Sequence, residues 1–135
     1  GSGAAGGLGA GLIAFLNADL KAGIDIVFDQ VQIKNKLNGV DLVITGEGAI
    51  DFQTIYDKAP IGVAKLARKY NIPTIGIAGM LGKDYTLVHK DGLQAVRSIV
   101  TGPMSLKDAS KSVYKLITES VEQSLRFINV GMKLK

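Results

Sequence analysis

Three apolar segments of strand type alternate with helical patterns from Val40 onward, and this alternation constrains the fold more than any other feature. The strand-type segments are residues 40–44, 72–79 and 95–100. Helical patterns follow them at residues 59–70, 85–90 and 106–128. Such alternation predicts parallel strands joined by right-handed crossovers. We therefore expect an α/β fold with a Rossmann-like or flavodoxin-like parallel sheet of about three strands and helices on both faces.

The chain before this alternation, residues 1–39, is a glycine-rich helical segment distinct from the α/β segment at residues 40–135. Apolar residues at helical spacing predict a helix from about Ala4 to Ala18. Its glycines make sense where a helix lies tightly against another element or a ligand. The first six residues carry the letters of a dinucleotide fingerprint, but no strand precedes them, so a close-packing helix is favoured. Because the glycines continue into this helix, Gly1 and Ser2 are interpreted as native residues.

The composition of the 135 residues excludes several classes of protein. There is no cysteine, so no disulfide framework is expected, which suits a cytoplasmic protein. No apolar run reaches the roughly eighteen residues that a membrane span needs. The net charge is +4, but the basic residues are dispersed and do not alternate with aromatics, so nucleic acid is not an expected partner. Three strands make a thin sheet, so either further strands of a longer chain or a partner, including a second copy, should cover an edge.

Polar side chains cluster directly after the first predicted strand, in a loop expected at residues 46–58. Its two carboxylates, Glu47 and Asp51, are suited to holding Mg²⁺, or to accepting a hydroxyl proton. Gly46 and Gly48 would let backbone N–H groups approach an anion closely. Ligands of open α/β sheets bind at the carboxyl ends of the strands, so this loop is the candidate site.

The second half of the same loop adds an amide, a hydroxyl and an ammonium group. Gln53 and Thr54 can donate hydrogen bonds to substrate oxygens, and Lys58 lies just before a helix N-terminus, a place that favours phosphate. Together these groups suit phosphoryl transfer, in which catalysis is mostly positioning and charge neutralisation. The structural alternative is that Asp51 and Thr54 only cap a turn. The only histidine, His89, is interpreted as a solvated surface residue, and Ser105 as a helix cap.

Several longer motifs resemble one family. The chain has GSGAAGGLGAGL at residues 1–12, GIDIVFD at 23–29 and VDLVITGEG at 40–48. These are followed by the spaced residues Asp51, Gln53, Thr54, Lys58, Pro60, Gly62 and Val63. The pattern resembles the C-terminal portion of the type 1 glycerate kinases of bacteria, and the similarity extends over nearly the whole chain.

This resemblance implies ATP-dependent phosphorylation of D-glycerate to a phosphoglycerate, with Mg²⁺, by an enzyme of two α/β domains. Family chains are much longer, so the missing N-terminal region is an expected partner and this chain alone is expected to be incomplete and inactive. Glu47 and Asp51 would then hold the metal or the substrate hydroxyl, with Lys58 as a further catalytic group. Substrate-binding positions would be Gly46, Gly48, Gln53, Thr54, Gly3, Gly6 and Gly7.

Two positions depart from the family pattern. Ala49 stands where the pattern has arginine, and Asp57 stands where it has glycine. Losing an arginine removes a bidentate clamp for carboxylate or phosphate, and Asp57 adds negative charge beside Lys58. A non-catalytic small-molecule-binding or interaction domain on the same scaffold is therefore the competing interpretation.

Overall fold

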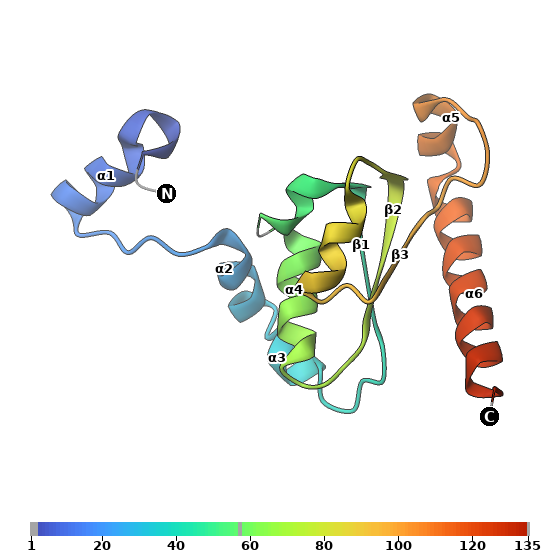
Figure 1. The fold of residues 1–135 in the computed structure, drawn as a ribbon. Coiled ribbons are helices and arrows are strands. Elements are labelled where there is room, and N and C mark those ends of the chain that lie inside the picture. The colour runs from blue at the N-terminus through green and yellow to red at the C-terminus, as the bar shows by residue number, and fades with distance from the viewer. Residues whose placement is uncertain (1–2, 57, 135) are drawn as a thin grey trace. The chain divides into compact units, whose positions relative to one another are not determined.

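The structure is a computed structural model that describes residues 3–56 and 58–134, so the interpretations of Gly1, Ser2 and Asp57 lie outside the described residues. The chain divides into two compact units, residues 1–35 and 36–135, and each is described by itself. The first unit contains α1 (Ala4–Leu16) and α2 (Gly23–Gln30), and α3 (Ile33–Lys36) begins at its end (Figure 1). Neither α1 nor α2 has a buried residue.

The start of α1 differs from the uninterrupted helix predicted for residues 4–18. Ala5, Gly6 and Gly7 have left-handed backbone angles, with φ of 50°, 66° and 87°. Regular helical turns therefore follow Gly7, and the helix ends at Leu16, where Asn17 caps it in a left-handed conformation. Glycine adopts positive φ without a steric penalty, so the two glycines favour this kink over continuous helix.

The second unit contains a sheet of three parallel strands, as the sequence predicts. They are β1 (Val43–Ile50), β2 (Thr74–Leu81) and β3 (Ala95–Ser98), in the order β1-β2-β3. The 3₁₀ helix η1 (Phe52–Ile55) and α4 (Ala59–Arg68) join the first two strands, and the 3₁₀ helix η2 (Tyr85–Asp91) joins the last two. The chain ends in α5 (Leu106–Lys111) and α6 (Val113–Met132). Figure 1 shows α4 and α6 on opposite sides of the sheet.

The core of this unit lies between the sheet and the layer of α4 and η2. Its fully buried members come from β1, β2, α4, η2 and the segment before β3: Ile50, Ala78, Ile61, Ala64, Val88 and Leu93. Gly76 of β2 borders this core, where an added Cβ would be 3.1 Å from both Ile50 Cδ1 and Val96 Cγ1. The core thus fixes the α4 side of the sheet and the position of the α4 N-terminus.

The predicted end of the first strand at Ile44 is wrong. β1 continues through Ile50, and its last residues pair in register with β2, Glu47 with Ala78 and Ala49 with Met80. The glycines at 46 and 48 suggest a loop by local propensity, but strand pairing overrides that preference. The first five residues of the predicted 46–58 loop are therefore strand, which holds Glu47 on a rigid element.

Other boundaries also shift. β2 begins at Thr74 rather than residue 72, and Pro73, which has no N–H, contributes its carbonyl oxygen to Val43 N. β3 ends at Ser98 rather than residue 100, because Ser98 Oγ accepts from Val100 N and donates to Gly79 O. The predicted helix at residues 106–128 is two helices that meet at Ser112, and the second continues to Met132. Among the described residues no helix is long and apolar enough to cross a membrane.

Candidate active site

The clearest polar feature at the carboxyl end of β1 is an ion pair between two residues that the sequence analysis singled out. Glu47 belongs to β1, and Lys58 is the N-cap residue of α4, with Pro60 in the first turn. Lys58 Nζ lies 3.7 Å from Glu47 Oε1, and the two side chains are 36% and 30% exposed. The structure therefore brings together a carboxylate, an ammonium group and a helix N-terminus, where the helix dipole also favours an anion.

The second oxygen of Glu47 has no hydrogen-bond partner in the described part of the chain. Glu47 Oε2 is buried and makes no hydrogen bond among the described residues. Buried carboxylate oxygens normally accept hydrogen bonds, because an unsatisfied polar atom loses its hydration without replacement. The bonding capacity of this oxygen is left available for a cation or for a hydroxyl group of a ligand.

Asp51 and Thr54 form a capping box at the start of η1. Asp51 Oδ1 accepts from Gln53 N at 2.8 Å, and Asp51 N donates to Thr54 Oγ1 at 3.1 Å. Thr54 is fully buried. The structural alternative, in which Asp51 and Thr54 cap a turn, is therefore formed. The cap uses Asp51 Oδ1 and does not use Asp51 Oδ2. A substrate-binding role for Thr54 stays a prediction, and its visible role is to hold the turn that positions Asp51.

Replacing Thr54 with valine tests this structural role. Valine has nearly the same shape but no oxygen, so Asp51 N would lose its acceptor at 3.1 Å. We expect the free energy of unfolding to fall by about 1–3 kcal/mol, the penalty for an unpaired buried donor. Thermal unfolding of the variant measures it. The matched control is Thr118→Val, because Thr118 is exposed and its hydroxyl only donates to Tyr114 O within α6. Equal stability of the two variants would contradict the capping role.

The segment after β2 lies directly against this turn. Gly82 N donates to Ile50 O at 2.8 Å, and Phe52 N donates to Lys83 O at 3.1 Å. A Cβ on Gly82 would lie 2.9 Å from Asp51 Cβ. Gly82 and Lys83 therefore give direct support to the turn that carries Asp51. Only the strand-end rule could have indicated it.

The glycines of β1 have different surroundings. A Cβ on Gly46 would lie 2.8 Å from Ile77 O, so close strand packing explains this glycine. A Cβ on Gly48 would meet nothing within 4 Å. Both residues line a hollow of about 470 Å³ between the strand ends and the first turns of α5 and α6. Gly48 is therefore open to a ligand at the carboxyl end of the sheet, whereas glycine at position 46 is required by the close packing of β1 against Ile77.

The remaining predicted residues are not part of this cluster in the structure. Gln53 is exposed, and its backbone N–H takes part in the cap. Gly3, Gly6 and Gly7 belong to the first unit, where Gly3 is the N-cap of α1. Ser105 is a helix cap, as predicted, since its hydroxyl accepts from Asp108 N. His89 Nδ1 lies 2.7 Å from Leu93 O and takes no part in the cluster.

A magnesium ion would have few protein ligands here. No group of three or more histidine, aspartate or glutamate side chains that could hold a metal occurs among the described residues. Mg²⁺ in phosphoryl-transfer enzymes is bound through one or two carboxylates together with water and substrate phosphates. Glu47 Oε2, which has no hydrogen-bond partner among the described residues, could be one such carboxylate ligand. Asp51, four residues further along the chain, could be the second.

Comparison with known proteins assigns the family. A family model described as "Glycerate kinase family" matches residues 1–129. The chain belongs to the glycerate kinase family. It is 48% identical over 134 residues to the glycerate kinase of Bacillus subtilis (strain 168), covering 99% of this chain and 34% of the relative. It is 45% identical over 133 residues to the glycerate 2-kinase of Escherichia coli (strain K12), covering 98% and 35%.

A solved structure of the same family has the same fold. The crystal structure of a protein assigned as glycerate kinase 2 in Salmonella typhimurium LT2 superposes with a TM-score of 0.74 and 43% sequence identity. The match covers 99% of this chain and 34% of that one. The chain thus spans about a third of the length of the glycerate kinases that it matches.

Proposed function

We propose that this chain is part of a kinase that transfers the γ-phosphoryl group of ATP to D-glycerate and yields a phosphoglycerate. The observation that carries the proposal is the Glu47–Lys58 pair at the end of β1, in a chain that belongs to the glycerate kinase family. A lysine at a helix N-terminus beside a carboxylate with one unpartnered oxygen suits the binding of a phosphate and its counter-ion.

The roles follow from what each group can do. Lys58 and the N-terminal amides of α4 would hold a phosphate oxygen of the nucleotide or the product. Glu47 would accept the proton of the attacking hydroxyl or hold Mg²⁺, and Asp51 would assist from the capped turn. Bound Mg²⁺ supplies neutralisation of the phosphate charges. Gly48 and the exposed Gln53 would contact the substrate at the same strand ends.

The chain would contribute the Rossmann-like C-terminal portion of a two-domain type 1 glycerate kinase. Because it spans about a third of its relatives, the remaining two thirds would supply the other half of the active site, and the chain alone would be inactive. The name of the Escherichia coli relative, glycerate 2-kinase, supports phosphorylation of the 2-hydroxyl. The need for ATP makes the cytoplasm the expected compartment.

The first test is phosphorylation of D-glycerate by the full parent chain, with and without Asp51→Asn. Asparagine is as good an N-cap as aspartate, so the turn and the melting temperature should be preserved while the charge is removed. We expect kcat to fall about tenfold or more, as for the loss of an assisting charged group. A coupled assay for ADP release measures it.

Two further results make this test decisive. Asp51→Ala should lower both kcat and the melting temperature, because alanine removes the cap at Gln53 N as well as the charge. Full activity of Asp51→Asn would restrict Asp51 to its structural role. No phosphorylation of D-glycerate by the parent chain would overturn the proposed function and favour a non-catalytic binding domain, with Ala49 as the first residue to restore to arginine.

A further inference from the structure

The charges of the candidate active site do not suit an anionic substrate. Glu47 and Asp51 contribute two carboxylates, and Lys58 contributes one ammonium group. D-glycerate is itself a carboxylate, and MgATP is an anion, so neither brings the missing positive charge. Lys58, at the N-terminus of α4, is suited to a phosphate. Because like charges repel strongly in a partly buried site, the carboxylate of the substrate needs a second cation.

The segment after β2 places such a cation beside the Asp51 turn. Lys83 lies two residues beyond the end of β2, and its carbonyl oxygen accepts from Phe52 N at 3.1 Å. One residue earlier, Gly82 N donates to Ile50 O at 2.8 Å. A Cβ on Gly82 would lie 2.9 Å from Asp51 Cβ, so glycine allows the two segments to approach this closely. The backbone of Lys83 is thus fixed next to a residue of the site.

The chain turns directly after Lys83. Asp84, the next residue, has a left-handed backbone with φ of 55° and ψ of 27°, and it begins η2. Aspartate tolerates this conformation better than most residues, but it is uncommon outside glycine and is often found at functional sites. On the far side of the turn, Val88 of η2 is fully buried in the core. Position 83 is therefore held from both sides.

The side chain of Lys83 is available for a ligand. Lys83 is exposed and has no hydrogen-bond or ion-pair partner in the described part of the chain. Its flexible four-carbon stem lets the ammonium group reach an anion several ångströms from the backbone. An exposed lysine is usually only solvated, so the fixed position of its backbone beside Asp51 is what distinguishes this one.

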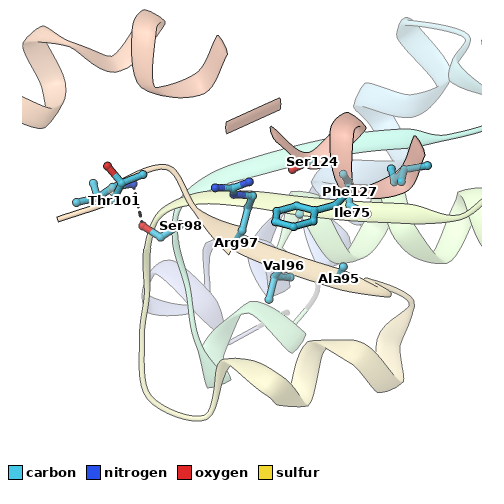
Figure 2. A pocket seen from close by; sticks show the side chains of 11 residues that line it. Ile75, Ala95, Val96, Arg97, Ser98, Thr101, Ser124 and Phe127 are labelled. Atoms are coloured by element: carbon cyan, nitrogen blue, oxygen red, sulfur yellow. Dashed lines mark hydrogen bonds between the residues drawn. The ribbon is translucent and has the colours of Figure 1, made fainter. Parts of the chain in front are cut away.

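Other cations of the second unit lie elsewhere or are engaged. Lys65 and Arg68 belong to the last turn of α4, and at 1.5 Å per residue their backbones are roughly 10 Å or more from that of Lys58. Figure 2 shows Arg97 in the groove between β3 and α6. There Arg97 Nη1 donates to Ser120 O at 3.4 Å. These residues do not supply the second cation at the end of β1.

We propose that Lys83 binds the carboxylate group of D-glycerate, while Lys58 holds the phosphate. This inference rests on the proposed function and names the group that recognises the acid. The carboxylate of the substrate then lies at the end of β2, and the hydroxyl that receives the phosphoryl group faces Glu47 and Lys58 at the end of the neighbouring strand β1. Lys83 thereby selects a hydroxy acid over an uncharged alcohol.

The Michaelis constants of the full parent chain and of its Lys83→Met variant test this role. Methionine keeps the apolar stem but removes the charge, and the exposed position makes a change in melting temperature unexpected. The KM for D-glycerate should rise about tenfold or more, the scale of losing a charge-assisted hydrogen bond. The KM for MgATP should stay within about twofold of the parent. Lys83→Arg keeps the charge and should rescue the KM for D-glycerate to within about threefold.

The uncharged amide of D-glycerate makes the test specific for the carboxylate. The amide offers no negative charge to Lys83, so its kcat/KM should be equal in the parent and in Lys83→Met. The preference for acid over amide should therefore fall by the same tenfold or so that the KM for D-glycerate rises. Equal losses with acid and amide would overturn the proposal, because they would indicate a general distortion of the site.

Lys107→Met is the matched control. Lys107 is an exposed cation in the first turn of α5, next to Leu106, which lines the hollow at the same strand ends. No backbone hydrogen bond joins α5 to the Asp51 turn among the described residues, so this variant should keep both Michaelis constants. Equal effects of the two methionine variants would overturn the proposal. A KM for MgATP that rises together with that for D-glycerate would also overturn it, by assigning Lys83 to the phosphates.

Calorimetric titration of D-glycerate without ATP separates this inference from the proposed function. A parent chain that binds D-glycerate about tenfold more tightly than Lys83→Met, yet does not phosphorylate it, refutes only the proposed function. A parent chain that phosphorylates D-glycerate with the same KM as Lys83→Met refutes only the role of Lys83. A parent chain that binds no D-glycerate overturns both.

Discussion

Replacing Glu47 with glutamine in the full parent chain is expected to lower kcat for glycerate phosphorylation by about a hundredfold or more, the scale of losing a positioned acid–base or metal-binding group. The physical reason is that Glu47 holds the ion pair with Lys58, while its buried Oε2 has no hydrogen-bond partner among the residues that the structure describes. Glutamine keeps the size and one oxygen but removes the negative charge. A steady-state assay at saturating MgATP measures the loss.

The melting temperature of Glu47→Gln should change little. The ion pair is partly exposed at 3.7 Å, and pairs of this kind contribute about 1 kcal/mol or less to stability. A large loss of activity with unchanged stability would then mark a chemical role rather than a structural one. Glu122→Gln is the matched control, because Glu122 also pairs with a cation, Arg126, at 2.7 Å on the exposed face of α6. It should keep full activity.

The magnesium dependence of the variant separates the two roles open to Glu47. If Glu47 holds Mg²⁺, the variant needs a higher Mg²⁺ concentration for half-maximal rate. If Glu47 accepts the hydroxyl proton, the Mg²⁺ requirement is unchanged and only kcat falls. General acid–base groups usually contribute about a hundredfold or more to kcat. If the variant keeps kcat within about threefold of the parent, both roles are excluded, and Glu47 serves only as the ion-pair partner of Lys58.

The sequence predicted the parallel sheet and put Glu47 and Lys58 in one candidate site, but it did not predict that Glu47 lies on a strand. Alternating apolar segments are enough to predict parallel strands, because strands buried on both faces leave a simple pattern. The position of Lys58 before Pro60 is likewise local information, and the structure has it as the N-cap of α4. The contact between Lys58 and Glu47 then follows from the crossover that brings the α4 N-terminus back to the end of β1.

What the sequence could not predict depends on contacts between distant segments. Gly46 and Gly48 resemble loop residues, yet both lie in β1, because β2 provides hydrogen-bond partners as far as Leu81. The break of the last helix at Ser112 is also invisible in a pattern whose apolar spacing continues through it. For Asp51, the sequence allowed both a cap and a chemical group, and the structure shows that the cap is formed.

Replacing Gly46, where β1 lies closest to β2, is expected to lower the stability of the protein strongly. Gly46→Ala would place a Cβ 2.8 Å from Ile77 O and 3.1 Å from Ile77 Cγ1. The nearer atom is backbone, so it cannot move aside by a rotamer change, and the strands must separate. We expect a loss of about 3 kcal/mol in the free energy of unfolding, the upper range for overpacking. The melting temperature of the parent chain, which is taken to be about three times as long as this chain, should fall by about 4 °C, as scanning calorimetry would record.

Two neighbouring glycines make this prediction specific. Gly79→Ala should be as damaging, since its Cβ would lie 2.7 Å from Gly48 O. Gly48→Ala should stay within about 1 kcal/mol of the parent, because its Cβ meets nothing within 4 Å and its φ is not in the left-handed region. If Gly48→Ala melts as early as Gly46→Ala, the cost belongs to any glycine in β1 and the contact with Ile77 is not its cause. If Gly48→Ala is stable but has a raised KM, the open space above Gly48 is where the substrate approaches the strand ends.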